Sequence, residues 1–270
     1  MKFIQKIQIL TFILFPGLVS CDKQTHEFTD SPIVEAYLTA GDHPKVTITR
    51  QIPFIEDADR SADNIDSLNV VLISDQETFT LKPLGNGVYM DSNVIVRDSG
   101  TYSIQFSFNQ KSVSATTTIP VKPLHFKQSA VKMNIVRMDS TSGPPSTMSD
   151  PITLSWTNSD ESTYLIVIEN LEDVLDPIRY FSDEDSIPTN FFRQQPTNTS
   201  EAEIRPMDFQ YFGTHRIILY HVLSDYANLY NQSTSSSQNL TNPSTTITNG
   251  FGIFTGLSAD TLYVRVIEID

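Results

Sequence analysis

The sequence predicts an all-β protein made of two antiparallel β-sandwiches of the immunoglobulin or fibronectin type, with one short helix in the second. Short segments alternate apolar and polar residues with a period of two, which is typical of strands that have one buried face. Clusters of glycine, asparagine, aspartate and serine separate them and favour tight turns. The 270 residues, of which 10% are aromatic, are enough for two hydrophobic cores. We expect a leader at residues 1–20, a tether at 21–31, one sandwich at 32–122 and another at 123–270.

The first sandwich is predicted from six alternating segments, which are residues 34–38, 45–50, 68–73, 77–82, 101–108 and 112–119. Residues 85–87 (Gly-Asn-Gly) and 98–100 (Asp-Ser-Gly) tolerate positive φ, so we expect turns there. Several short strands joined by such turns indicate an antiparallel sandwich.

The second sandwich follows Pro120 and Pro123, which interrupt the alternation and begin a connection. Its predicted strands are residues 152–156, 164–169, 215–223 and 262–267, and residues 139–151 are expected to form a loop. A serine or aspartate cap predicts a short helix at 224–230. Residues 232–248 are rich in serine, threonine and asparagine and predict a long polar loop.

The single tryptophan, Trp156, lies on an alternating strand, where an aromatic residue is normally part of the core. Core packing is therefore our interpretation. The alternative is a platform on which a sugar ring stacks, which would need further aromatic residues from nearby loops. The residues that could supply them are Phe191, Phe192, Tyr211 and Phe212.

The beginning of the chain has the layout of a secretory signal. Lys2 and Lys6 precede an apolar run at residues 9–15, which is too short for a membrane-spanning helix of about 20 residues. Residues 18–21 (Leu-Val-Ser-Cys) resemble the lipobox of bacterial lipoproteins, in which the cysteine sulfur carries the lipid. Cys21 is the only cysteine, so no intramolecular disulfide can form. We expect a lipid anchor at Cys21; the alternative is a cysteine left at the end of an ordinary signal peptide.

The residues after Cys21 bear on the location of the protein. Lys23 stands two places after the cysteine, as in the surface-export signal of Bacteroidota lipoproteins, but Gln24 and Thr25 occupy places where acidic residues are usual. The expected location is the outer membrane, with the periplasmic and the cell-surface face both open.

The charge of the chain excludes one class of partner. Removing residues 1–20 removes two lysines and no acid, which leaves 16 basic and 32 acidic residues and a net charge near −16. A polyanion would be repelled, so we expect no nucleic-acid partner.

Patterns that would indicate catalysis or metal binding are missing from the sequence. It has no G-x-S-x-G turn, no H-E-x-x-H or C-x-x-C zinc pattern, and no glycine loop that opens a helix. His215 and His221 are six apart on a predicted strand, hence about 20 Å apart, which is too far to share a metal ion. We expect no enzyme activity, cofactor or metal, and specifically no hydrolysis.

Residues 56–66 form an acidic segment with oxygen-bearing side chains at positions 57, 59, 61 and 63, as in a calcium loop. Ala62 replaces the turn glycine and Leu68 the bidentate glutamate of that loop. We expect a solvated loop here, with calcium binding as the alternative. Ser140 and Ser186 each follow an aspartate, in three-residue stretches that resemble the O-glycosylation signal of exported Bacteroidota proteins, and are candidate glycosylation sites.

Besides the lipobox, five stretches are distinctive, which are residues 32–38, 46–50, 87–89, 100–102 and 247–256. Together they resemble a family of uncharacterised Bacteroidota lipoproteins, numbered four-two-four-nine among domains of unknown function. The resemblance covers nearly the whole mature chain. It implies pairing with a TonB-dependent outer-membrane transporter and an accessory or binding role in nutrient capture, with no catalytic residues. A structural or adhesive surface protein is the alternative.

The resemblance is sharpest from the predicted helix to residues 249–254. Phe251, Gly252 and Phe254 are therefore candidate contact residues for a transporter partner, because glycines allow close approach of another surface. The alternative is that the two phenylalanines only close one end of the second sandwich.

Overall fold

The computed structural model describes residues 30–52, 65–75, 77–138, 149–179, 189–233 and 245–269, with the side chains of residues 230–233 left aside. Within these ranges the protein is all-β, with one short α-helix and one turn of 3-10 helix. All the elements belong to one compact unit, residues 31–270.

The first half of the chain contains eight of the described strands. They are β1 (Pro32–Thr39), β2 (Lys45–Arg50), β3 (Val71–Ser74), β4 (Thr78–Thr80), β5 (Lys82–Gly85), β6 (Val88–Met90), β7 (Thr101–Phe108) and β8 (Lys111–Thr118). The predicted strands at 45–50 and 101–108 are confirmed with the same bounds. The predicted strand at 77–82 is divided at the buried Leu81, between β4 and β5.

The second half continues the β pattern. Its elements are β9 (Leu124–Gln128), β10 (Lys132–Val136), β11 (Ile152–Thr157), β12 (Thr163–Asn170), β13 (Phe191–Arg193), β14 (Glu201–Ile204), η3 (Pro206–Asp208), β15 (Gly213–Val222), α2 (Ser224–Ser233) and β16 (Phe251–Ile269). The predicted helix is confirmed as α2. The two separate apolar stretches expected at 251–254 and 262–267 are parts of one 19-residue strand, β16.

Both predicted turns are confirmed by left-handed backbone conformations. Asn86 has φ of 55° in the turn between β5 and β6, and Ser99 has φ of 58° just before β7. Asparagine adopts this conformation more readily than most residues, because its short polar side chain can hydrogen-bond to the nearby backbone.

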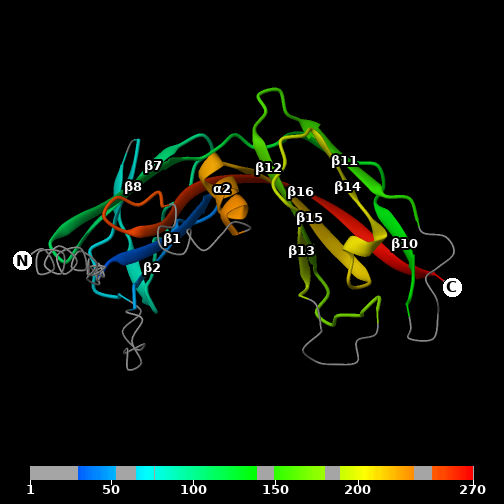
Figure 1. Cartoon of the computed structure of the whole chain (residues 1–270), viewed down its shortest axis with the longest axis horizontal. Coiled ribbons are helices and arrows are strands. Elements are labelled where there is room, and N and C mark those ends of the chain that lie inside the picture. The colour runs from blue at the N-terminus through cyan, green and yellow to red at the C-terminus, as the bar shows by residue number, and fades with distance from the viewer. Residues whose placement is uncertain are drawn as a thin grey trace, which may run out of the picture. The chain divides into compact units, whose positions relative to one another are not determined.

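The strands form three sheets (Figure 1). The largest has the order β13-β12-β15-β16-β1-β2-β6-β5, with β10 also paired to β16. The others are the three-stranded sheet β14-β11-β9 and the four-stranded sheet β4-β3-β7-β8. Figure 1 shows β16, in orange to red, as a single long strand whose first part pairs with β1 and whose later part pairs with β15.

The two halves have separate hydrophobic cores. The first contains residues from β1 to β8, and the second contains residues from β9 to β16. β16 contributes to both, because Phe254 is buried in the first core, whereas Val264 and Val266 are buried in the second. The sequence division at residue 122 placed Ile247 and Phe254 in the second sandwich, but the structure packs both in the first core.

Two strand pairings differ from the expected antiparallel arrangement. β1 and β16 are parallel, with Ile33 opposite Phe251 and Thr39 opposite Leu257. β10 and β16 are also parallel. The prediction of purely antiparallel sheets is wrong at these positions. Hairpin turns in the sequence predict only pairings between neighbouring strands, whereas parallel strands need a long crossover connection that leaves no local signal.

Candidate binding groove

The largest sheet has a face turned away from both cores, and a third apolar cluster lies on it. Alternate residues of β12 enter the second core, whereas Leu165 and Val167 lie on the opposite face. On the neighbouring strands, Val222 and Leu257 are partners in register and lie on the same face. β1 follows the same rule, since Glu35 and its alternate neighbours face away from the first core. One continuous surface therefore crosses four strands.

This surface is hollowed into a groove of about 410 Å³. The volume lies in the range of about 300 to 1,000 Å³ typical of small-ligand sites. Its apolar floor is made by Leu165, Val167, Val222 and Leu257. The other lining side chains are the tyrosines Tyr37, Tyr220 and Tyr226, the charged residues Glu35 and Arg193, and Thr39.

Helix α2 forms one wall of the groove, and Figure 1 shows it beside β16. The ring of Tyr226 packs edge-on against Tyr37, with 5.7 Å between ring centroids. Asp225 fixes the start of the helix, because its Oδ1 accepts hydrogen bonds from the Tyr226 N–H (2.7 Å) and from the Thr255 hydroxyl on β16 (2.9 Å). Helix α2 and strand β16 are thereby held together beside the groove.

Charges surround the apolar floor. Burial raises the pKa of Tyr220; the charges of Glu169 and Asp42 act in the same direction, whereas Arg216 and Arg193 lower it. Arg216 forms an ion pair with Glu169. The Arg193 guanidinium lies 5.9 Å from the centre of the Phe191 ring. The groove therefore combines an apolar floor with charged and phenolic side chains, which suits binding of a small amphipathic molecule.

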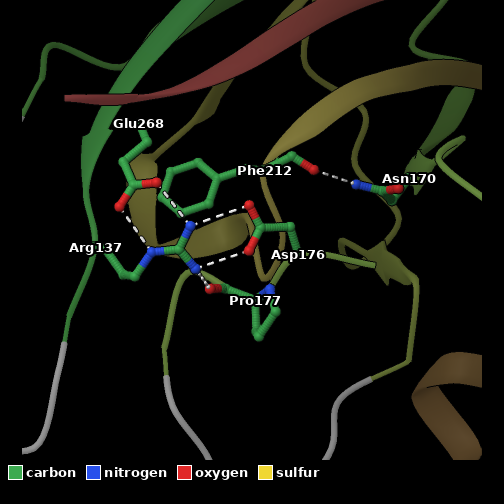
Figure 2. A network of polar contacts seen from close by, with 6 residues as sticks. All are labelled: Arg137, Asn170, Asp176, Pro177, Phe212 and Glu268. Carbon is green, nitrogen blue, oxygen red and sulfur yellow. Dashed lines mark hydrogen bonds and ion pairs between the residues drawn. The ribbon is translucent and has the colours of Figure 1, made fainter. Parts of the chain in front are cut away.

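A cluster of polar residues centred on Arg137 lies beside Phe212 of the second core (Figure 2). Arg137, just after β10, forms ion pairs with Asp176 (2.8 Å) and with Glu268 on β16 (2.7 Å), and it donates a hydrogen bond to the Pro177 carbonyl (2.7 Å). Its guanidinium also lies 4.7 Å from the centre of the Phe212 ring. These contacts raise the pKa of Arg137 and lower the pKa values of Asp176 and Glu268. The cluster joins the segment after β10, residues 176–177 and the end of β16, and we interpret it as a structural clamp.

Replacing the clamp arginine should measurably destabilise the protein. We expect Arg137→Met to lower the free energy of unfolding by about 1 to 2 kcal/mol at neutral pH, because several charge-assisted hydrogen bonds are lost at once. Both carboxyl pKa values are lowered in the folded state, so this stabilisation is present at neutral pH and lost as the pH falls through the folded-state values. Urea unfolding at pH 7 and pH 3 measures it.

Arg205→Met is the matched control, because Arg205 pairs with Glu203 at 3.6 Å and both side chains are more than half exposed. Its expected loss is below about 0.5 kcal/mol. Equal losses for the two variants would contradict the clamp.

The two strand histidines are core residues. His215 and His221 are 3% and 7% exposed. His215 packs against Phe209, and His221 stacks on Tyr164 with centroids 4.9 Å apart. In the part of the chain that the structure describes, no three histidine, cysteine, aspartate or glutamate side chains are grouped closely enough to hold a metal ion.

Core packing of Trp156 is confirmed. The residue is 5% exposed and lies among Phe126 and Tyr164, with centroids 6.5 Å and 5.5 Å away. The sugar-platform alternative is wrong for this residue, because a buried ring offers no face to a ligand. Tyr211 and Phe212 are buried as well.

Residues 22–262 match the family described as a domain of unknown function, DUF4249. The chain belongs to this family. The matched region includes every residue that lines the groove of this DUF4249 protein. No curated protein matches it.

Two titin structures are similar to the DUF4249 chain at a low level. A chimeric titin Z1Z2 carrying an exogenous peptide from decorin has 12% identity and a TM-score of 0.20, over 90% of this chain and 100% of that chain. A crystal structure of a stretch of titin domains has 8% identity and a TM-score of 0.21, over 88% of this chain and 68% of that chain. Scores this low carry no argument about fold or function.

The structure corrects the contact role predicted for Phe254 of the DUF4249 protein and places Gly252 against another strand of the chain. Phe254 is fully buried in the first core, so no partner can reach it. Gly252 faces β1, where an added Cβ would lie 2.0 Å from the Val34 carbonyl oxygen. Phe251 pairs with Ile33 in the same ladder but is partly exposed, and its contact role stays a prediction. The glycine does allow a close approach, but the approaching surface is another strand of the same chain.

The other predicted sites lie outside the described residues. These are Cys21, Ser140, Ser186 and most of the acidic segment 56–66. Within that segment Asp66 is described, and its Oδ1 accepts a hydrogen bond from the Gly87 N–H (2.6 Å). No described helix is both long and apolar enough to cross a membrane.

The groove itself was not predicted from the sequence. A signal was present, because residues 164–168 and 217–220 are apolar at consecutive rather than alternate positions. Such runs indicate strands covered on both faces, and here the second face is the groove floor.

Proposed function

We propose that this DUF4249 protein is a lipid-anchored accessory or binding protein of the outer membrane, which assists a TonB-dependent transporter in nutrient capture. The observation that carries the binding role is the groove of about 410 Å³ between α2 and the largest sheet. Its rigid floor comes from hydrogen-bonded strands, which suits a preformed ligand site. The transporter partner follows from the family resemblance described above. The role is one of binding rather than catalysis.

The architecture that we propose for this role is a pair of immunoglobulin- or fibronectin-like sandwiches. Its support is the presence of two separate cores, each enclosed by part of the largest sheet and by a smaller sheet. In this arrangement the strand β16 joins the two sandwiches, and the groove lies on their shared sheet. Binding sites are common at such junctions.

The proposed function can be tested by purifying the native protein from membranes in mild detergent and identifying what accompanies it. We expect the mature chain to begin at a lipid-modified Cys21 and to copurify with an outer-membrane transporter. Cys21→Ala should leave the chain unprocessed or release it from the membrane, because the thiol is the point of lipid attachment. Mass spectrometry of the N-terminal peptide and membrane fractionation measure both effects.

Ser20→Ala is the matched control, because it keeps a small residue before the cysteine and should be processed normally. If Cys21→Ala loses residues 1–20 and still stays as firmly membrane-bound as the native chain, the anchor is wrong. If the lipidated native protein reproducibly purifies without any transporter, the accessory role is wrong.

A further inference from the structure

We propose that the end of the groove formed by Glu35, Tyr37 and Tyr226 binds organic cations, in which a quaternary or protonated amine carries an apolar body. This inference rests on the binding role proposed above and names the chemical class of small molecule that the groove takes.

The negative charge at this end of the groove comes from Glu35. Its side chain is exposed, and within the described part of the chain its carboxylate accepts no hydrogen bond and forms no ion pair. Lys45 on β2 is a diagonal neighbour of Glu35 in the sheet, but it forms no ion pair with Glu35 and is outside the described lining of the groove. The Glu35 carboxylate is therefore open to a cation that enters the groove. The net negative charge of the chain attracts cations over a longer range.

Two aromatic rings stand next to this carboxylate. Tyr37 is two residues from Glu35 on β1, so both side chains point to the same face of the sheet, about 7 Å apart. The ring of Tyr226 packs edge-on against Tyr37, with 5.7 Å between ring centroids. The face of a tyrosine ring carries a negative potential and attracts an ammonium group within about 6 Å. A carboxylate beside such rings therefore suits an organic ammonium ion.

The start of α2 does not oppose a cation, although the N-terminus of a helix carries a partial positive charge. The Asp225 carboxylate lies in the first turn, and its Oδ1 accepts a hydrogen bond from the Tyr226 N–H. The same oxygen accepts a hydrogen bond from Thr255, which is opposite Tyr37 in the ladder between β1 and β16. A second carboxylate is thus held next to the pair of tyrosines, where it offsets the charge of the helix end.

The rest of the groove favours a ligand with an apolar body and a charge at one end only. Beyond Thr39 the floor continues through Leu257 and Val222, which are partners in register on neighbouring strands. A hydrocarbon group would remove their apolar surface from water. Arg193 lies on β13, four strand steps from β1 in the sheet order and hence about 19 Å away. That distance exceeds the Debye length of about 8 Å at physiological salt, so its charge has little effect at Glu35.

Titration calorimetry on the full mature protein in nonionic detergent can test this inference with butyltrimethylammonium. The comparison ligands are tetramethylammonium, butyrate, choline and the dimethylbutanol isostere of choline in which carbon replaces the nitrogen, each also titrated into detergent alone. We expect butyltrimethylammonium to bind about tenfold more tightly than tetramethylammonium, because its butyl group reaches the apolar floor. Choline should bind about tenfold more tightly than its uncharged isostere. Butyrate should not bind.

Variants at two positions separate the carboxylate from the aromatic ring. Glu35→Gln should weaken binding of butyltrimethylammonium about tenfold, because the anion is removed. Tyr37→Leu should weaken it about fivefold, since leucine keeps an apolar surface but has no ring face, whereas Tyr37→Phe should bind nearly as tightly as the native chain. Glu201→Gln and Tyr263→Leu are matched controls, because both side chains are exposed and outside the described lining of the groove. They should bind like the native chain.

Glu35 and Tyr37 are exposed, so unchanged melting temperatures will show that their variants are folded. Failure of butyltrimethylammonium to bind would overturn the inference. So would equal binding of choline and its uncharged isostere, or folded Glu35→Gln and Tyr37→Leu proteins that bind butyltrimethylammonium as tightly as the native chain. Copurification of a transporter with a protein that ignores these cations would overturn this inference alone and leave the accessory role standing.

Discussion

Gly252→Ala is expected to lower the free energy of unfolding by about 3 kcal/mol. Gly252 has φ of +101° and lies opposite Val34 in the parallel ladder between β1 and β16. An added Cβ would lie 2.0 Å from the Val34 carbonyl oxygen, which is a backbone atom that cannot rotate away. The substitution therefore forces the two strands apart in addition to straining the left-handed backbone.

Gly85→Ala separates these two causes. Gly85 has a similar φ of +94°, but an added Cβ there meets no atom within 4 Å. It should cost only the conformational strain, about 1 kcal/mol. Urea unfolding of both variants measures the difference. Equal losses would show that the strands move apart freely, and that the β1–β16 contact does not hold the first core together.

Much of the fold could be predicted because the relevant signals are local. Alternation predicted β2 and β7 with the observed bounds, and small polar residues predicted the turns at Asn86 and Ser99. These features depend on residues only a few positions apart. The short strands β9, β10, β13 and β14 were not predicted, since three to five residues give too little pattern to recognise.

The candidate site could not be predicted because it depends on pairings between distant residues. Glu35 and Arg193 line one groove only because β1 pairs with β16 and β12 pairs with β13. The sequence near Phe254 was correctly singled out as unusual, but its glycines and aromatic residues serve the joint between the two cores. A strong local motif therefore indicated that the segment matters without indicating to which surface it binds.

The stability of the protein is expected to fall by up to about 3 kcal/mol between pH 7 and pH 4 through the single residue His215. The imidazole is 3% exposed and packs against the ring of Phe209 at 4.9 Å between centroids. Its Nδ1 lies 3.2 Å from the Gly213 carbonyl, and its Nε2 lies 3.2 Å from Nδ2 of Asn170. These contacts suit a neutral ring that donates from Nδ1 and accepts at Nε2.

Burial lowers the pKa of His215 from 6.5 to about 4, although the hydrogen bond to Gly213 and the charge of Glu172 act in the opposite direction. The unfolded chain takes up a proton as the pH falls through 6.5, whereas the folded chain resists until about pH 4. The contribution to stability is therefore complete above pH 6.5 and is lost progressively between pH 6.5 and 4. A pKa difference of this size corresponds to about 3 kcal/mol.

His215→Gln should remove this pH dependence, because glutamine keeps a polar side chain at the position but does not titrate. The measurement is urea unfolding of the native chain and the variant at intervals from pH 7 to pH 4. The carboxylates that also titrate at the acidic end, such as Asp176, are common to both proteins and cancel in the comparison.

His125→Gln is the control, since His125 is exposed and its ring lies 2.9 Å from the Thr157 hydroxyl at the surface. The control should keep the slope of the native chain between pH 6.5 and 4. A variant at His215 with the same slope as the native chain would mean that the ring is protonated in the folded protein, and that the buried pair with Asn170 is not the arrangement present in solution.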